Sequence, residues 1–112
     1  MTAADGPLVA ATAADAPDLL AALRSCIESG SSRLLLERDA LADSFFDLRT
    51  GIAGELLQNA ANYGIRTAAV VPDLDSRPVR FRELALEAER GAGFRVFATR
   101  DEAIAWLASS PW

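Results

Sequence analysis

The stretch Arg33-Leu34-Leu35-Leu36-Glu37 decides the fold. It is a short, uninterrupted apolar run between charged residues. A strand with one face in water alternates apolar and polar side chains, whereas a strand covered on both faces is apolar throughout. We therefore predict that residues 33–37 form a strand of a parallel sheet with helices packed on it.

Three further apolar runs of strand length lie along the chain, at residues 8–12, 66–71 and 94–98. Segments with apolar residues at helical spacing follow each of the four runs, so that strands and helices alternate. This order predicts a single α/β domain over residues 1–112, with a mostly parallel four-stranded sheet and about four helices joined by right-handed crossovers. Residues 1–7 are predicted to be a flexible N-terminal tail.

Caps and glycines indicate the helix limits. Asp15 is the predicted cap of the first helix and Gly30 its end. The second helix is expected from near Leu48 or Thr50 to Tyr63, after a loop over residues 38–47. Thr99 and Glu102 form a predicted capping box for the last helix. The expected buried positions are Leu19, Leu20, Leu23, Cys26 and Ile27 in the first helix, Ile52, Leu56, Ala60 and Tyr63 in the second, Phe81, Leu84, Ala85 and Ala88 in the third, and Ile104, Leu107 and Ala108 in the last.

The composition excludes several classes of function. The chain has no histidine and one cysteine, Cys26, which rules out a Ser-His-Asp or Cys-His site within one chain and a zinc site of ordinary composition. The net charge is −5 and the arginines are scattered, so neither nucleic acid nor an anionic membrane is an expected partner. No cofactor and no metal are predicted. The lone cysteine, the absence of a signal sequence and the absence of a long apolar run favour the cytoplasm.

The segment from Asp43 to Gln58 is the predicted functional region. Ligands of open α/β sheets bind outside the carboxyl ends of the strands, where this loop and the loop 72–78 are expected. A helix start there favours an anion. The candidate binding residues are Phe45, Phe46, Asp47, Arg49, Thr50, Gly51, Glu55, Gln58 and Asp73.

Ordinary structural interpretations stay open for each candidate. Asp47 or Thr50 is a plausible helix cap, and at least one of Phe45 and Phe46 is expected in the core, with the other as an exposed anchor. Gly51 and Gly54 are expected inside the helix, where glycine is unfavourable; the favoured explanation is close packing on the sheet, and the alternative is close approach of a ligand to Gly51.

The segment Phe45-Phe46-Asp47-Leu48-Arg49-Thr50-Gly51-Ile52-Ala53-Gly54-Glu55-Leu56-Leu57-Gln58 resembles the hallmark of the bacterial domain-of-unknown-function family 4180. That hallmark reads Phe-Phe-Asp-Leu-x-Thr-Gly-x-Ala-Gly-Glu-x-Leu-Gln and is followed by Asn-Tyr, as at Asn62-Tyr63 here. Weaker resemblance extends over residues 32–107. The chain departs from the family at Asn59, where a basic residue is usual, and at Ala88-Glu89, where Ser-Asn is usual. The resemblance implies no activity.

A more distant resemblance is to the STAS domain of sulfate transporters and anti-sigma-factor antagonists. In those regulators an apolar strand leads to Asp-Ser-Ser-Gly at a helix start, and a phosphorylated serine switches binding to a partner. Here Leu34-Leu35-Leu36 leads to Asp47 and then to Thr50-Gly51. The resemblance implies a fold with a parallel sheet and a phosphorylation site at Thr50.

Three hypotheses of function are open. The first is a STAS-like regulatory or protein-binding module, switched at Thr50. The second is a small-molecule-binding protein or enzyme with a polar crevice in which Arg49 holds an anion and Glu55 or Asp47, with its pKa raised by desolvation, is the general base. The third is a homodimer anchored by Trp106 and Trp112, because tryptophan is enriched at interfaces. Whether the protein is an enzyme stays open, with a non-enzymatic role favoured.

Overall fold

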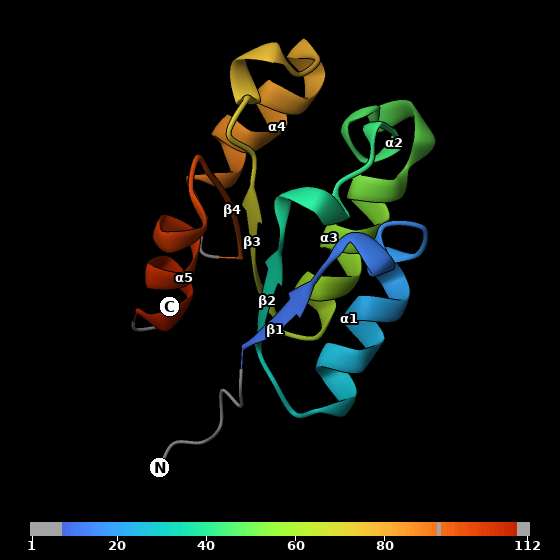
Figure 1. Ribbon diagram of the computed structural model, residues 1–112, viewed down its shortest axis with the longest axis vertical. Coiled ribbons are helices and arrows are strands. Elements are labelled where there is room, and N and C mark those ends of the chain that lie inside the picture. The colour runs from blue at the N-terminus through green and yellow to red at the C-terminus, as the bar shows by residue number, and fades with distance from the viewer. Residues whose placement is uncertain (1–7, 92, 110–112) are drawn as a thin grey trace.

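Four strands form one parallel sheet in the computed structural model, which describes residues 8–91 and 93–109 (Figure 1). They are β1 (Val9–Ala11), β2 (Arg33–Leu36), β3 (Arg66–Val70) and β4 (Phe94–Phe97). Their order in the sheet is β1-β2-β3-β4, so neighbours along the chain are also neighbours in space. Leu35 pairs with Ala10 on one side and with Ala68 on the other. The predicted α/β fold with a parallel four-stranded sheet is confirmed.

Three helices connect the strands: α1 (Leu19–Glu28), α3 (Ile52–Asn62) and α4 (Val79–Ala88). All three contribute to one core cluster, because right-handed crossovers between strands in sequential order place every connection on the same face of the sheet. The last helix, α5 (Arg100–Ala108), follows β4 and covers the opposite face (Figure 1). The short helix α2 (Asp43–Phe46) precedes α3.

Strand β2 contributes side chains to both cores. Leu34 and Leu36 belong to the core under α1, α3 and α4, whereas Leu35 belongs to the core under α5. All three leucines are completely buried. Each contributes roughly 1.5–3 kcal/mol of transfer free energy, so the two-sided burial of this strand strongly favours the observed sheet. The expectation drawn from the apolar run 33–37 is confirmed.

The start of α1 differs from the prediction. Asp18, not Asp15, caps this helix, because its carboxylate accepts the Ala21 N–H at 3.2 Å. Asp15 closes the preceding 3₁₀ turn η2 (Ala13–Asp15), where its carboxylate accepts the Thr12 N–H at 2.8 Å. The two carboxylates lie three residues apart, and each serves its own turn. Leu19, Leu23 and Cys26 are buried as expected, while Leu20 and Ile27 are half-buried.

The limits and the buried face of α3 also differ from the prediction. The helix begins at Ile52, because Gly51 has a left-handed φ of 79° that no α-helix contains. Its buried residues are Ala53, Leu56 and Ala60, whereas Ile52 is 36% exposed and Tyr63 is 62% exposed. Positions four apart drift around a helix with 3.6 residues per turn, so an i, i+4 stripe leaves the core at its ends.

The other elements are close to their predicted positions. Thr99 caps α5 by accepting the Glu102 N–H at 3.2 Å. In α5, Leu107 is buried as expected, but Ile104 is half-buried and Ala108 is exposed; Ala103 is buried in their place. The buried residues of α4 are Phe81 and Ala85, whereas Leu84 and Ala88 are half-buried. The predicted loops contain short helices, namely η3 (Arg38–Ala40) and α2 in residues 38–47, and η5 (Leu74–Ser76) in residues 72–78. The predicted tail 1–7 and Trp112 lie outside the described residues.

Candidate functional site

The predicted functional region folds as a corner over residues 42–56, which we call the α2–α3 corner. It consists of α2, the 3₁₀ turn η4 (Leu48–Thr50) and the first turns of α3. Gly51 joins the turn to the helix in a left-handed conformation that glycine adopts without steric cost. The corner thus changes the chain direction twice within a few residues.

The Thr50 hydroxyl stabilises this corner. Its Oγ1 lies 2.8 Å from the carbonyl oxygens of both Ser44 and Asp47, to which it donates, and it accepts the Ile52 N–H at 3.2 Å. The last of these bonds satisfies a backbone donor of the first turn of α3, which has no partner inside the helix. The side chain is therefore a local cap, and the residue is at the same time exposed to solvent.

Asp47 and Arg49 form a two-pronged ion pair on the outside of the corner. The guanidinium donates from Nε to Oδ1 and from Nη2 to Oδ2, each at 3.0 Å, and the Arg49 N–H reaches Oδ1 at 3.1 Å. These hydrogen bonds hold the pKa of the Asp47 carboxyl below its usual value and raise that of the guanidinium. The prediction that desolvation raises the pKa of Asp47, one of the two residues suggested as general base, is therefore wrong.

Phe45 and Phe46 are both buried, so the expectation that one of them is an exposed anchor is wrong. Their rings meet edge to face with centroids 5.5 Å apart, and both contact Phe81 of α4, at 5.8 and 4.8 Å. Edge-to-face pairs of this kind contribute about 0.5–1.5 kcal/mol beyond their buried area. The expected core role of at least one phenylalanine is confirmed, and this aromatic cluster fixes α2 against α4.

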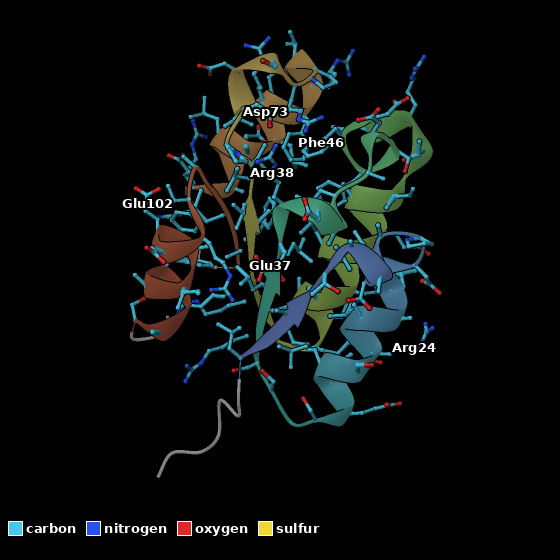
Figure 2. All side chains as sticks on the ribbon, viewed as in Figure 1. Arg24, Glu37, Arg38, Phe46, Asp73 and Glu102 are labelled. Atoms are coloured by element: carbon cyan, nitrogen blue, oxygen red, sulfur yellow. The ribbon has the colours of Figure 1, made fainter. Side chains whose placement is uncertain are left out.

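Arg77 joins the two acidic loops that the sequence places at the carboxyl edge of the sheet. Its guanidinium lies 3.2 Å from the carboxylate of Asp73 and 3.6 Å from that of Asp43, and its Cζ is 3.9 Å from the centroid of the Phe46 ring. Figure 2 shows Phe46 and Asp73 at the same end of the molecule, the end at which α2 and α4 lie. The Arg77–Asp43 pair therefore links the loop after β3 to α2, and Asp73 pairs with Arg77 within that loop.

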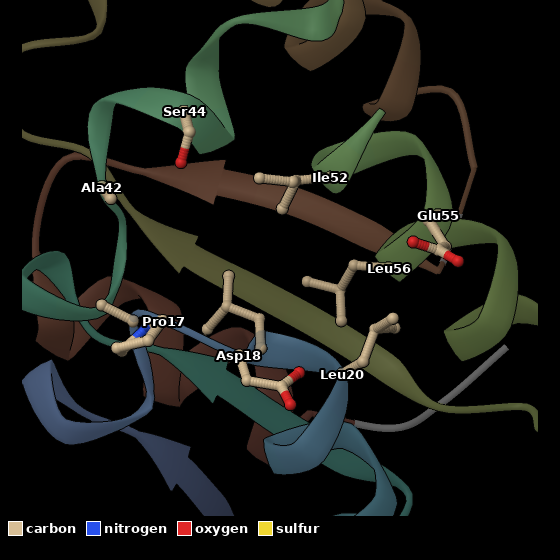
Figure 3. A pocket seen from close by; sticks show the side chains of 10 residues that line it. Pro17, Asp18, Leu20, Ala42, Ser44, Ile52, Glu55 and Leu56 are labelled. Carbon is tan, nitrogen blue, oxygen red and sulfur yellow. The ribbon is translucent and has the colours of Figure 1, made fainter. Parts of the chain in front are cut away.

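One hollow lies on the α1 side of the corner, and we call it the α1–α3 groove (Figure 3). It has a volume of about 320 Å³ and an apolar floor that includes Leu20, Ile52 and Leu56. The carboxylates of Asp18 and Glu55 stand at its rim, and Ser44 lines it from α2. Its further lining residues are Ala16, Pro17, Leu19 and Ala42.

A second hollow, which we call the α2–α4 hollow, lies on the other side of the corner and has a volume of about 580 Å³. Phe46, Leu48 and Pro78 line it with apolar surface, and Asp47, Arg49 and Arg80 add charge. Pro78 and Arg80 were not predicted from the sequence as site residues. The available signal was the close spacing of Arg77, Arg80 and Arg82 in a chain whose net charge is −5.

The structure does not gather the predicted polar residues in a single crevice. Asp47 and Arg49 line the α2–α4 hollow and Glu55 lines the α1–α3 groove, whereas Asp73 lines a separate hollow of about 250 Å³ between the ends of β3 and β4. Gln58 lines none of these three hollows and donates to the Asn62 side chain at 3.1 Å.

Neither glycine of the corner has the role that was favoured from the sequence, which was close packing of the helix on the sheet. A Cβ added at Gly51 or at Gly54 would meet no atom within 4 Å, so close packing on the sheet explains neither. Gly51 is required by its positive φ. Gly54 lies on the exposed face of α3, and no contact of the described chain requires it.

Trp106, the described member of the proposed dimer anchors, packs on its own chain. The Cζ atoms of Arg66 and Arg95 lie 4.1 and 5.6 Å from the centroid of its ring, and Phe97 contacts it at 5.7 Å. These contacts leave the side chain half-buried.

Two features are absent from residues 8–91 and 93–109. No three side chains of the types that bind metal ions gather there closely enough to hold one. None of the helices in this part of the chain combines the length and the apolar composition that crossing a membrane requires.

Fold and surface together define a small α/β domain with an all-parallel sheet, an aromatic cluster under the α2–α3 corner and open hollows on both sides of it. The model of the family described as domain of unknown function DUF4180 matches residues 1–107, and the chain belongs to this family. The match confirms the family resemblance seen in the sequence and extends it to the N-terminal residues. No curated protein and no solved structure matches the chain.

Proposed function

We propose that this domain is a STAS-like, cytoplasmic regulatory module that binds a partner protein through the α1–α3 groove. The observation that supports it is the groove itself, an apolar floor between two helices with carboxylates at the rim. Amphipathic segments of partner proteins dock in such grooves by placing apolar anchors on the floor.

The charges at the groove favour one kind of occupant. Glu55 is exposed on α3, and Asp18, although it caps α1, carries its carboxylate at the opposite rim. The whole chain is acidic, with a net charge of −5. Complementary charges speed the encounter of partners and exclude wrong ones. We therefore expect a segment with one large apolar side chain and a neighbouring lysine or arginine.

A photo-crosslinking experiment in native cytosol tests this proposal. A photoreactive residue replaces Ile52 in the groove, and in a matched control it replaces Ser25, which is exposed on α1 and does not line the groove. We expect a defined partner segment to be crosslinked from position 52 and absent from position 25. The same crosslinks from both positions would contradict the proposal.

The captured segment, made as a synthetic peptide, provides the second step. Its affinity is expected to fall about tenfold for Glu55→Lys, because charge reversal at a rim costs roughly 1–2 kcal/mol. Glu28→Lys, an exposed reversal at the far end of α1, is the control. Equal affinity for both variants would reject the charge argument. Phe46→Ala is unsuitable for this purpose, since truncation of a buried phenylalanine costs about 3–5 kcal/mol of stability.

Thr50 is the proposed phosphorylation switch of this module. A phosphorylated Oγ has no hydrogen left to donate, so it loses both carbonyl contacts, and the added charge approaches Asp47. Phosphorylation would thereby open the corner that carries Ser44 and Ile52 into the groove. Thr50→Val removes the hydroxyl without adding charge, so a peptide affinity that falls further for Thr50→Glu than for Thr50→Val supports a charge-driven switch. Equal effects would leave Thr50 with a capping role alone.

A further inference from the structure

We propose that the α2–α4 hollow binds a small organic anion, with an apolar body that carries a phosphate or a carboxylate. This site lies on the opposite side of the α2–α3 corner from the groove assigned to the partner protein. A result that refutes one of the two proposals therefore leaves the other unaffected.

The positive charge around the hollow is the first argument. Arg49 and Arg80 line it, and Arg82 lies in the same first helical turn as Arg80, whereas the charge of the nearby Arg77 is offset by Asp43 and Asp73. This concentration of guanidinium groups contrasts with the net charge of −5 of the whole chain. Guanidinium groups bind phosphate and carboxylate through paired N–H donors, which makes arginine the preferred residue for such anions.

The two arginines that line the hollow have guanidinium N–H donors available for a ligand. Arg80 has no hydrogen bond or ion pair with any side chain or carbonyl of the described residues. Arg49 pairs with Asp47 through Nε and Nη2, which leaves the Nη1 edge of the guanidinium in solvent, and its side chain is 91% exposed. Asp47 orients this edge, and the hollow retains a net positive charge after the pair is counted.

The start of α4 adds to the attraction. The residue before the helix is Pro78, and no side chain of the described chain caps the helix. Backbone N–H groups of a first helical turn have no partner within the helix, and the helix dipole favours negative charge beside them. Pro78 and Arg80 both line the hollow, so the start of α4 lies beside it.

The apolar surface of the hollow sets the rest of the ligand. Leu48 and Pro78 provide carbon surface beside the charges, with the buried Phe46 ring behind them, and the volume of about 580 Å³ lies in the range of small-molecule sites. An inorganic ion would leave this surface in water. An aromatic or aliphatic body covers it, so the structure favours an organic anion over a bare ion.

A two-dimensional ¹H–¹⁵N NMR titration at low ionic strength tests this proposal. The probes are phenyl phosphate, benzoate, inorganic phosphate and, as a cation of similar shape, benzylamine. We expect saturable shifts at residues 46–49 and 79–81 with phenyl phosphate or benzoate, and the tighter of the two identifies the anionic group. Inorganic phosphate is expected to bind at least about threefold more weakly, and benzylamine not at all. No saturable shift with either organic anion, or equal affinity for inorganic phosphate, would overturn the proposal.

Arginine variants locate the binding. Arg80→Gln leaves the corner intact and is expected to weaken binding roughly threefold to tenfold, while Arg49→Gln/Arg80→Gln weakens it more than tenfold. Arg24→Gln, an exposed position on α1, is the matched control and keeps the wild-type affinity. The dispersion of each spectrum reports folding independently of binding. Equal affinity of wild type and the double variant would refute the site.

Discussion

Gly51 and Gly54 lie three residues apart, yet replacing each with alanine is expected to change stability in opposite directions. Gly51 has a φ of 79°, which costs an alanine about 1–2 kcal/mol. The stiffer unfolded chain of the variant offsets about 0.4–1 kcal/mol of that cost. Gly54 lies in α3 in open space, so alanine there removes a helix penalty of up to about 1 kcal/mol.

The free energy of unfolding is expected to fall by about 0.5–1.5 kcal/mol for Gly51→Ala and to rise by about 0.5–1 kcal/mol for Gly54→Ala. Urea unfolding followed by circular dichroism measures both, with equal slopes of free energy against urea as the check on two-state behaviour. Changes of the same sign would refute the assignment of Gly51 to the joint and of Gly54 to the exposed face. If Gly54→Ala stabilises the fold but weakens partner binding, Gly54 marks a place where the partner approaches the helix backbone.

Three other measurements check the structure. Arg77→Ala is expected to lower the free energy of unfolding in urea by about 1–2.5 kcal/mol, because it removes a cation–π contact and two partly exposed ion pairs. Arg24→Ala is the control and is expected to change that free energy by less than about 0.5 kcal/mol. Burial raises the pKa of the Cys26 thiol, so a thiol reagent at pH 8 should react slowly with the native protein and at a rate that rises in parallel with unfolding; fast labelling of the folded state would contradict its burial. The Asp47–Arg49 pair lowers the pKa of Asp47 in the folded state. The pair therefore contributes to stability above about pH 4, and this contribution is lost as the pH falls through the lowered pKa. The difference in free energy of unfolding between wild type and Asp47→Asn should accordingly shrink at acidic pH and stay constant above about pH 4.

The strands and their parallel arrangement were predictable because burial alone determines them. The leucines at 34–36 are consecutive, so their side chains point to both faces of the sheet, and both faces require cover. The cap at Thr99 was equally predictable, since its bond to the Glu102 N–H depends only on residues three apart. Local patterns of this kind need no knowledge of the rest of the fold.

The candidate site was harder to predict because it depends on contacts across the chain. Arg77 pairs with Asp43 over more than thirty positions, and no local pattern selects that partner among the acidic residues. Gly51 was predicted to lie inside a helix because the apolar residues Ile52, Leu56 and Ala60 follow it at helical spacing. In the structure the left-handed backbone of Gly51 prevents the helix from extending before Ile52. The burial of both Phe45 and Phe46 depends on Phe81, which belongs to a different helix.

The single helix on one face of the sheet has a consequence for synthesis on the ribosome. The sheet residues Leu35, Ala68 and Val70 are covered by Ala103 and Leu107, which are translated after β3 is complete. At about 5–20 residues per second, synthesis from the end of β3 to the end of α5 takes roughly 2–8 seconds. A chain that stops in this interval has no α5 to cover that face of the sheet. Truncation before residue 100 is expected to make this condition permanent and to produce aggregates rather than a smaller folded domain.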